Sequence, residues 1–185
     1  GFEITFRQHH GFSVSSGPLH KRIENAAKAY AETVHQSESA VPNCSIQVQG
    51  APLLHCGLGM GTAVSMSVAR ALYRYEMNVG DLDPAVCAEM LGRGKRSAIG
   101  TRGSFQGGFI HDDFKDEDGL AACISQHGMP IDWRILLLID KSAAEGLSGE
   151  REEIVFEESP EVSRWKIWAL DKMAHWKILA TFIKV

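Results

Sequence analysis

A glycine-rich turn that leads directly into a long apolar helix constrains this chain more than any other sequence feature. The turn reads Gly57-Leu58-Gly59-Met60-Gly61-Thr62, and the helical pattern after it runs over residues 64–77. The start of a helix presents unpaired backbone N–H groups and the positive end of the helix dipole, and glycine lets the backbone close around an anion. The pattern predicts a phosphate-binding helix start. A plain glycine-rich connection is the alternative.

Two common phosphate-binding motifs are absent from this turn. A P-loop requires a lysine after its last glycine, and none follows Gly61. The dinucleotide fingerprint G-x-G-x-x-G requires a third glycine where this chain has Thr62. The turn therefore predicts anion binding without indicating either of these nucleotide-binding classes.

Composition limits the partners and the compartment. The chain has 185 residues, 44% of them hydrophobic, and a net charge of -4, so no overall positive field attracts nucleic acid or an anionic membrane. The four cysteines are widely spaced and lack a zinc-binding pattern, which predicts reduced, buried thiols in a cytoplasmic protein. They are Cys44, Cys56, Cys87 and Cys123. No membrane span or signal peptide is expected, and the missing initiator methionine predicts a fragment or a processed chain.

The order of secondary-structure patterns predicts an α+β or mixed α/β sandwich. Short strands at 2–6 and 12–14 are expected to form a hairpin or two edge strands, and a strand is expected at 44–49. Helices are expected at 19–35, 64–77 and 84–91, the last with Asp83 as cap and Pro84 at its first position. Further strands are expected within 103–110 and 133–139, the second of them buried.

The last third of the chain changes character. Residues 150–161 are acidic, whereas 164–184 are basic and hold Trp165, Trp168 and Trp176 at roughly helical spacing. Such a helix is expected to pack on its own domain. A membrane surface or a partner groove is the alternative.

A second group of polar residues contains four cations within ten residues, Arg93 to Arg102. Arginine binds phosphate and carboxylate oxygens through paired, charge-assisted hydrogen bonds, so this segment predicts a second part of an anion site, with a solvated loop as the alternative. A third small, glycine-rich loop follows the strand expected at 133–139, and its candidate residues are Lys141, Gly146, Ser148 and Gly149. His111-Asp112-Asp113 could ligate Mg²⁺, but Asp-rich turns more often face water.

The three segments, in this order, resemble the beta-ribofuranosylaminobenzene 5'-phosphate synthase family, a branch of the GHMP kinase superfamily. The resemblance is carried by His55-Cys56-Gly57-Leu58-Gly59-Met60-Gly61-Thr62, by Gly92-Arg93-Gly94-Lys95-Arg96-Ser97-Ala98-Ile99-Gly100-Thr101 followed by Gly107-Gly108-Phe109-Ile110, and by Gly146-Leu147-Ser148-Gly149. It implies a GHMP-kinase-like two-layer sandwich, of the ribosomal protein S5 domain 2-like type, incomplete at both ends. Residues 1–150 would form the phosphate-binding domain, and 151–185 would begin a truncated second domain.

The resemblance also implies a reaction. Phosphoribosyl pyrophosphate would condense with 4-aminobenzoate or 4-hydroxybenzoate, with loss of CO2 and pyrophosphate, in methanopterin biosynthesis. Mg²⁺ and a homodimer are expected with it, and no nucleic acid or membrane partner. Positioned donors would stabilise the departing pyrophosphate, and no nucleophilic triad is needed.

Residue roles follow from the same resemblance. The catalytic candidates are His55, Arg93 and Arg96. The phosphate-binding candidates are Gly57, Leu58, Gly59, Met60, Gly61, Thr62, Lys95, Ser97, Gly100 and Thr101, and the metal ligands remain unknown.

Two alternatives stay open at this point. One is an ATP-dependent small-molecule kinase of the same superfamily, although such kinases usually place serine where this chain has Met60. The other is an inactive fragment of either enzyme.

Overall fold

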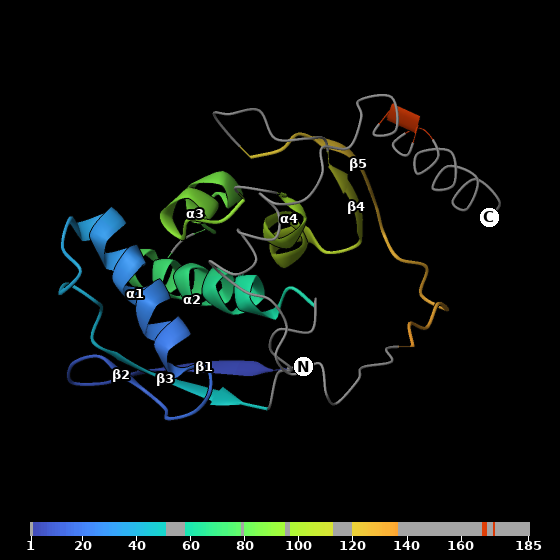
Figure 1. The fold of residues 1–185 in the computed structure, drawn as a ribbon. Coiled ribbons are helices and arrows are strands. Elements are labelled where there is room, and N and C mark those ends of the chain that lie inside the picture. The colour runs from blue at the N-terminus through green and yellow to red at the C-terminus, as the bar shows by residue number, and fades with distance from the viewer. Residues whose placement is uncertain are drawn as a thin grey trace, which may run out of the picture. The chain divides into compact units, whose positions relative to one another are not determined.

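The computed structural model describes residues 2–50, 58–78, 80–94, 97–112 and 120–136, together with Trp168, Ala169 and Lys172. The chain divides into two compact units, Gly1–Gly146 and Leu147–Val185. The labelled helices and strands in Figure 1 all belong to the first unit. In the second unit the three described residues are helical, and the rest of the expected tryptophan-bearing helix lies outside the described residues.

Three strands form a mixed sheet in the order β1-β3-β2. They are β1 (Glu3–Gln8), β2 (Ser13–Val14) and β3 (Cys44–Gln49). β1 pairs antiparallel with β3, and β2 pairs parallel with it. The sequence correctly predicted two edge strands, and the alternative of a hairpin is wrong because β3 pairs between the two.

Helices α1 (His20–His35) and α2 (Met60–Met77) cover one face of this sheet, as Figure 1 shows. Alternation along β3 turns Cys44 and Ile46 toward the helices, while Gln47 and Gln49 face solvent. The buried side chains of all three elements form one core, which includes Ile23 and Tyr30 of α1 and Val64 and Leu72 of α2. The expected helices and the strand at 44–49 are thus confirmed.

Helix α3 (Pro84–Met90) forms as its sequence predicts. The carboxylate of Asp83 accepts hydrogen bonds from the backbone N–H groups of Ala85 and Val86, and Pro84 occupies the first helical position. Cys87 and Ala88 pack with Met66 and Ala69 of α2 in a second core cluster.

An arginine pair on α2 fixes the connection to α3 and the neighbouring helix α4 (Ile99–Gln106). Asp81 accepts hydrogen bonds from Arg70 and, at 2.8 Å, from Arg74. Arg70 also donates to the carbonyl of Ser104 at 2.6 Å and lies 4.0 Å from the ring centroid of Phe105, both in α4. The hydrogen bond from Arg70 holds the pKa of Asp81 below its ordinary value.

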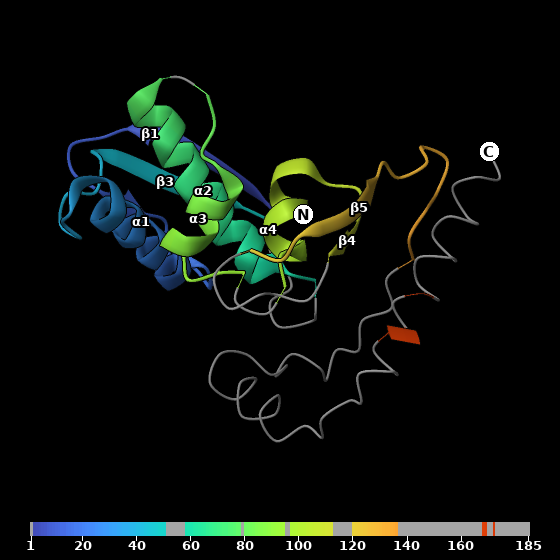
Figure 2. The ribbon, with the colours of Figure 1, turned by 90° about the horizontal axis from the view of Figure 1, so that it is seen from above.

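Helix α4 corrects one sequence prediction. The segment 103–110 was expected to be a glycine-broken strand, but most of it belongs to α4, and the strand β4 (Phe109–Asp112) follows. β4 pairs antiparallel with β5 (Cys123–His127). Gly107 and Gly108 have positive φ and separate the helix from the strand, so the glycines mark a boundary. Figure 2 shows α4 beside this two-stranded sheet.

The buried strand expected at 133–139 is also wrong over its described part. Residues 133–136 form no strand, and the side chains of Ile135 and Leu136 are 73% and 83% exposed. The remainder of that segment lies outside the described residues.

The α+β class predicted from the sequence is confirmed by these four helices and five strands of the described ranges. The specific sandwich of the GHMP kinase superfamily remains a prediction. Among the described residues, no helix is both long and apolar enough to cross a membrane.

Candidate functional site

The start of α2 has no side-chain cap from its N-cap residue, Gly59. The helix begins at Met60, earlier than its apolar pattern indicates, so Gly61 and Thr62 lie in its first turn. Gly59 precedes it in the left-handed conformation, with φ of 64°, and has no side chain that could cap the helix. Within the described ranges, no side chain accepts a hydrogen bond from the N–H groups of Met60, Gly61 or Thr62. Backbone amides in the first turn of a helix are of the kind that can donate to an anion.

Arg22 of α1 reaches this helix start. A Cβ added to Gly61 would lie 2.8 Å from Nη1 of Arg22 and 3.0 Å from its Cζ, so the guanidinium lies against the backbone of the first turn. Glycine at position 61 makes this close approach possible. The side chain of Arg22 is half-buried, and within the described part of the chain it forms no hydrogen bond or ion pair.

Arg93 approaches the same region from the end of α3. The N–H of Gly92 donates to the carbonyl of Glu89 at 2.9 Å, and the N–H of Arg93 donates to that of Ala88 at 2.7 Å. With Gly92 at φ of 60°, this is the Schellman arrangement that ends many helices. Two backbone hydrogen bonds therefore fix the position from which the Arg93 side chain extends.

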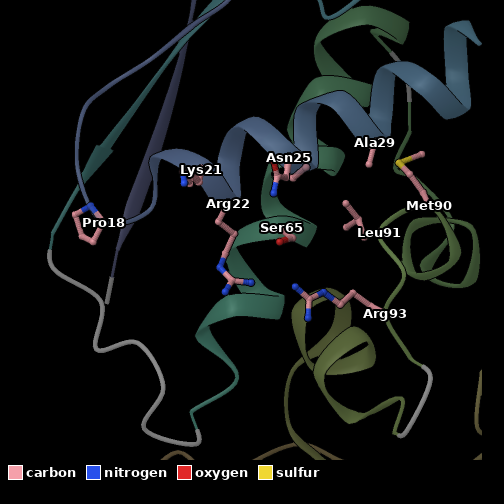
Figure 3. A pocket seen from close by; sticks show the side chains of 10 residues that line it. Pro18, Lys21, Arg22, Asn25, Ala29, Ser65, Met90, Leu91 and Arg93 are labelled. Atoms are coloured by element: carbon pink, nitrogen blue, oxygen red, sulfur yellow. The ribbon is translucent and has the colours of Figure 1, made fainter. Parts of the chain in front are cut away.

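A pocket of about 520 Å³ lies between α1, α2 and the end of α3. Figure 3 shows the guanidinium groups of Arg22 and Arg93 pointing toward one another across it, with Ser65 of α2 between them. Its described lining has three cations and no carboxylate: Pro18, Lys21, Arg22, Asn25, Ala26, Ala29, Ser65, Met90, Leu91 and Arg93. This local positive charge, in a chain of net negative charge, suits an anionic ligand.

Ser65 contributes differently from the cations. Its hydroxyl donates to the carbonyl of Gly61 at 3.1 Å, and the residue is only 4% exposed. The proton is already engaged, so this hydroxyl can only accept a hydrogen bond from a ligand.

The predicted phosphate ligands in α4 have other contacts. The hydroxyl of Ser97 donates to Asp112 at 3.0 Å and accepts from the N–H of Ile99 at 3.2 Å. Asp112 also accepts from the N–H of Ala98 at 2.7 Å, so it caps α4. Thr101 is 1% exposed. Phosphate binding by Ser97 and Thr101 remains a prediction.

Gly100 permits close packing of α4 against the start of α2. A Cβ at this position would lie 3.2 Å from Cγ2 of Thr62. Its role as a phosphate ligand also remains a prediction, and the structure supplies a packing reason for this glycine.

The remaining candidates lie outside the described residues. They are His55, Gly57, Lys95, Arg96, Lys141, Gly146, Ser148 and Gly149. Among the residues that the structure does describe, no group of three His, Cys, Asp or Glu side chains could hold a metal ion. Asp112, which the sequence offered as a magnesium ligand or a water-facing residue, caps α4.

Sequence reasoning missed the contribution of α1. Lys21, Arg22 and Asn25 line the pocket, but the sequence indicated only an amphipathic helix there. Arg22, Ala26 and Ala29 have the i, i+4, i+7 spacing of one helix face. This face is largely buried, so a charged residue is unexpected on it. That mismatch was the available signal.

Comparison with curated proteins finds two similar sequences. A beta-ribofuranosylphenol 5'-phosphate synthase of Archaeoglobus fulgidus is 29% identical over 171 residues, which cover 85% of this chain and 51% of that protein. A protein of the same name from Methanothermobacter thermautotrophicus is 31% identical over 120 residues, 56% of this chain and 35% of that protein. The chain thus spans about half the length of the first relative and about a third of the second. No protein-family profile matches it.

These similarities support the suggested synthase family, and they suggest an enzyme. The names of both relatives describe a synthase of a ribofuranosyl phosphate, which agrees with the resemblance found in the sequence.

Proposed function

We propose that this chain is the phosphate-binding part of a synthase that transfers the phosphoribosyl group of phosphoribosyl pyrophosphate to a para-substituted benzoate. Pyrophosphate and CO2 leave in this reaction, which belongs to methanopterin-type cofactor biosynthesis. The observation that supports it best is that the guanidinium of Arg22 lies against Gly61 in the first turn of α2 and also lines a pocket that contains Arg93 and Lys21 and no carboxylate among its described residues.

The names of the relatives bear on the acceptor. Both describe a ribofuranosylphenol product, so they favour 4-hydroxybenzoate over 4-aminobenzoate as the acid. Loss of the carboxylate from 4-hydroxybenzoate leaves a phenol ring, which matches the product in the relatives' names. The match covers 51% of the first relative and 35% of the second, and the proposal concerns the complete enzyme.

The chemistry requires stabilisation of negative charge. As the bond between the anomeric carbon and pyrophosphate breaks, charge accumulates on the departing oxygens and a positive charge develops on the ribose. The amides of Met60, Gly61 and Thr62 are suitable donors to the phosphate oxygens. Lys95 and Arg96, which lie outside the described residues, would add positive charge.

The described pocket does not itself provide a magnesium site, because no carboxylate lines it. Mg²⁺ would neutralise pyrophosphate when bound with the substrate, but we assign it no protein ligand.

The test is product formation by a full-length version of the enzyme. Incubation with phosphoribosyl pyrophosphate and 4-hydroxybenzoate labelled at its carboxyl carbon should release labelled CO2 and a ribofuranosylphenol phosphate. Incubation with ATP and small alcohols serves as the competing assay. A phosphorylated alcohol without CO2 release would identify a kinase and reject the synthase proposal.

A further inference from the structure

A segment directly after β5 concentrates exposed apolar side chains. Within residues 129–136, Ile131, Ile135 and Leu136 are 96%, 73% and 83% exposed, and Met129 and Trp133 are 38% and 46% exposed. Figure 1 shows this segment as the orange trace that follows β5. Single exposed apolar side chains are common on protein surfaces, whereas a contiguous group marks a surface that binds another molecule. We call residues 129–136 the apolar segment.

Hydrogen bonds within the apolar segment fix its backbone. The N–H of Trp133 donates to the carbonyl of Pro130 at 3.1 Å, which closes a turn around Ile131. Nη1 of Arg134 donates to the carbonyls of Ile131 at 3.0 Å and of Trp133 at 2.8 Å. The turn therefore holds Ile131 in solvent, and a partner that binds there meets a segment that is already ordered.

Two opposite charges lie within the apolar segment, on either side of Trp133. Asp132 and Arg134 are both exposed. Among the described residues, Asp132 has no hydrogen-bond or ion-pair partner, and Arg134 donates only to backbone carbonyls. Nε and Nη2 of this guanidinium can still donate to a carboxylate. The segment thus offers one anion and one cation beside its apolar side chains.

We propose that the apolar segment binds the same segment of a second copy of this chain, around a two-fold axis beside Trp133. In a symmetric dimer of this kind, residues equally distant from the axis along the two copies meet one another. Asp132 of each copy contacts the partner's Arg134, so the ion pair forms twice. Ile131 packs against the partner's Ile135. This interface is inferred independently of the proposed function.

Charge selects this register and this kind of partner. An axis beside Asp132 would bring two carboxylates together, and an axis beside Arg134 would bring two guanidinium groups together, whereas an axis beside Trp133 pairs opposite charges. A membrane surface fits the segment less well. Anionic lipid attracts clustered cations, and here Asp132 offsets the charge of Arg134.

The small size of the apolar segment sets the expected affinity. Stable interfaces contain about 20–30 residues on each side, and this segment is much shorter. We therefore expect a dissociation constant of about 10–100 μM. At about 1 μM, a concentration suited to urea unfolding, the chain is then monomeric.

The test is the mass of the 185-residue chain in analytical ultracentrifugation, between about 1 and 300 μM. The wild type should change from a single chain of 20.3 kDa to a dimer as the concentration rises. Asp132→Arg and Arg134→Asp each place like charges at both contacts, so each should weaken self-association at least about tenfold. An equimolar mixture of these two variants should recover association, because every contact then joins an arginine to an aspartate.

Two control variants separate this contact from general effects of charge. Glu38→Arg alters an exposed residue elsewhere and changes the net charge as Asp132→Arg does, so it should dimerise like the wild type. The exchange of both residues in one chain, Asp132→Arg with Arg134→Asp, keeps opposite charges at each contact and should dimerise as well. Circular dichroism and thermal melting show whether each variant retains the fold.

Three results would overturn the proposal. They are a wild-type chain that stays monomeric up to about 300 μM, self-association that either charge reversal leaves unchanged, and folded single variants whose mixture associates no more than each alone. The first would mean that another molecule or another part of the chain covers the apolar segment. The other two would place the contact between copies elsewhere. Product formation by the full-length enzyme is measured separately, so failure of that assay leaves this interface standing.

Discussion

The guanidinium of Arg22 lies in the space that a side chain at position 61 would occupy, so Gly61 and Arg22 determine one another's geometry. Gly61 belongs to the first turn of α2, where glycine is otherwise an unfavourable residue. Its presence is explained by the approach of Arg22 and not by a requirement for unusual backbone angles.

Replacement of Gly61 by alanine should therefore weaken ligand binding without lowering the stability of the fold. The added methyl group would lie 2.8 Å from a flexible side-chain end, so Arg22 moves while the backbone stays in place. We expect the free energy of unfolding in urea to be unchanged or higher by up to about 1 kcal/mol. Binding of inorganic pyrophosphate should weaken several-fold.

Gly103→Ala is the matched control, because it also adds a methyl group within a helix. Its Cβ would lie 4.0 Å from the nearest atom, Cδ1 of Ile110, an ordinary contact. It should gain similar stability and keep wild-type binding. Equal pyrophosphate affinity in the two alanine variants would contradict the role assigned to the Arg22 position.

Removal of the Asp112 side chain should destabilise the protein through α4. Its carboxylate accepts hydrogen bonds from the N–H of Ala98 and the hydroxyl of Ser97 at the start of that helix. Asp112→Ala should lower the free energy of unfolding by about 1–2 kcal/mol, as measured in urea. Asp132→Ala, which removes an exposed carboxylate, should change it by less than about 0.5 kcal/mol. A comparable loss in both variants would argue against the capping role.

Acid should weaken the fold through Asp81. Hydrogen bonds from Arg70 hold the pKa of this carboxyl below its ordinary value of 3.8, so the unfolded chain binds its proton at higher pH than the folded chain. The resulting stability is present above about pH 4 and is lost as the pH falls through the folded-state pKa.

Urea unfolding of the wild type and of Asp81→Asn, between pH 7 and pH 3, tests this contribution. The variant should be less stable at pH 7, and the difference between the two proteins should shrink toward pH 3. Asp132→Asn should follow the wild-type curve. A constant difference between wild type and Asp81→Asn at every pH would show that titration of Asp81 does not contribute.

The thiols should differ sharply in reactivity. Burial raises the pKa of Cys44 to about 11 and that of Cys87 to about 12, whereas Cys123 is exposed. The thiolate is the reactive form, so iodoacetamide at pH 8 should label Cys123 in the folded chain and reach Cys44 and Cys87 only after unfolding. Peptide mass spectrometry with and without urea measures this. Rapid labelling of Cys87 in the folded chain would contradict its burial.

The sequence predicted the elements whose signals are local. The period of α1, the alternation along β3, and Asp83 with Pro84 at the start of α3 each lie within one short segment. The prediction that the thiols are buried is confirmed for Cys44 and Cys87. It is wrong for Cys123, whose strand has a solvent-facing side. Cys56 lies outside the described residues.

The errors arose where distant residues decide the structure. Helix α4 is capped by Asp112, which follows it in sequence by several residues, and glycines in that segment were interpreted as a broken strand. The position of Arg22 against Gly61 depends on the packing of α1 on α2, which no local pattern encodes. The glycine turn and the arginine segment therefore stay predictions as a binding site, and the wall that α1 supplies was not predicted.

The Schellman ending of α3 has a consequence for how this pocket can change over time. Main-chain hydrogen bonds from Gly92 and Arg93 hold the loop in shape whatever side chain follows the glycine. Position 93 can thus exchange its charge for another chemistry while the scaffold survives, whereas Gly92 cannot vary so freely. Residue 93 influences which ligand binds, whereas Gly92 is needed for the end of the helix. Substitutions at position 93 can therefore change the ligand without destabilising the fold.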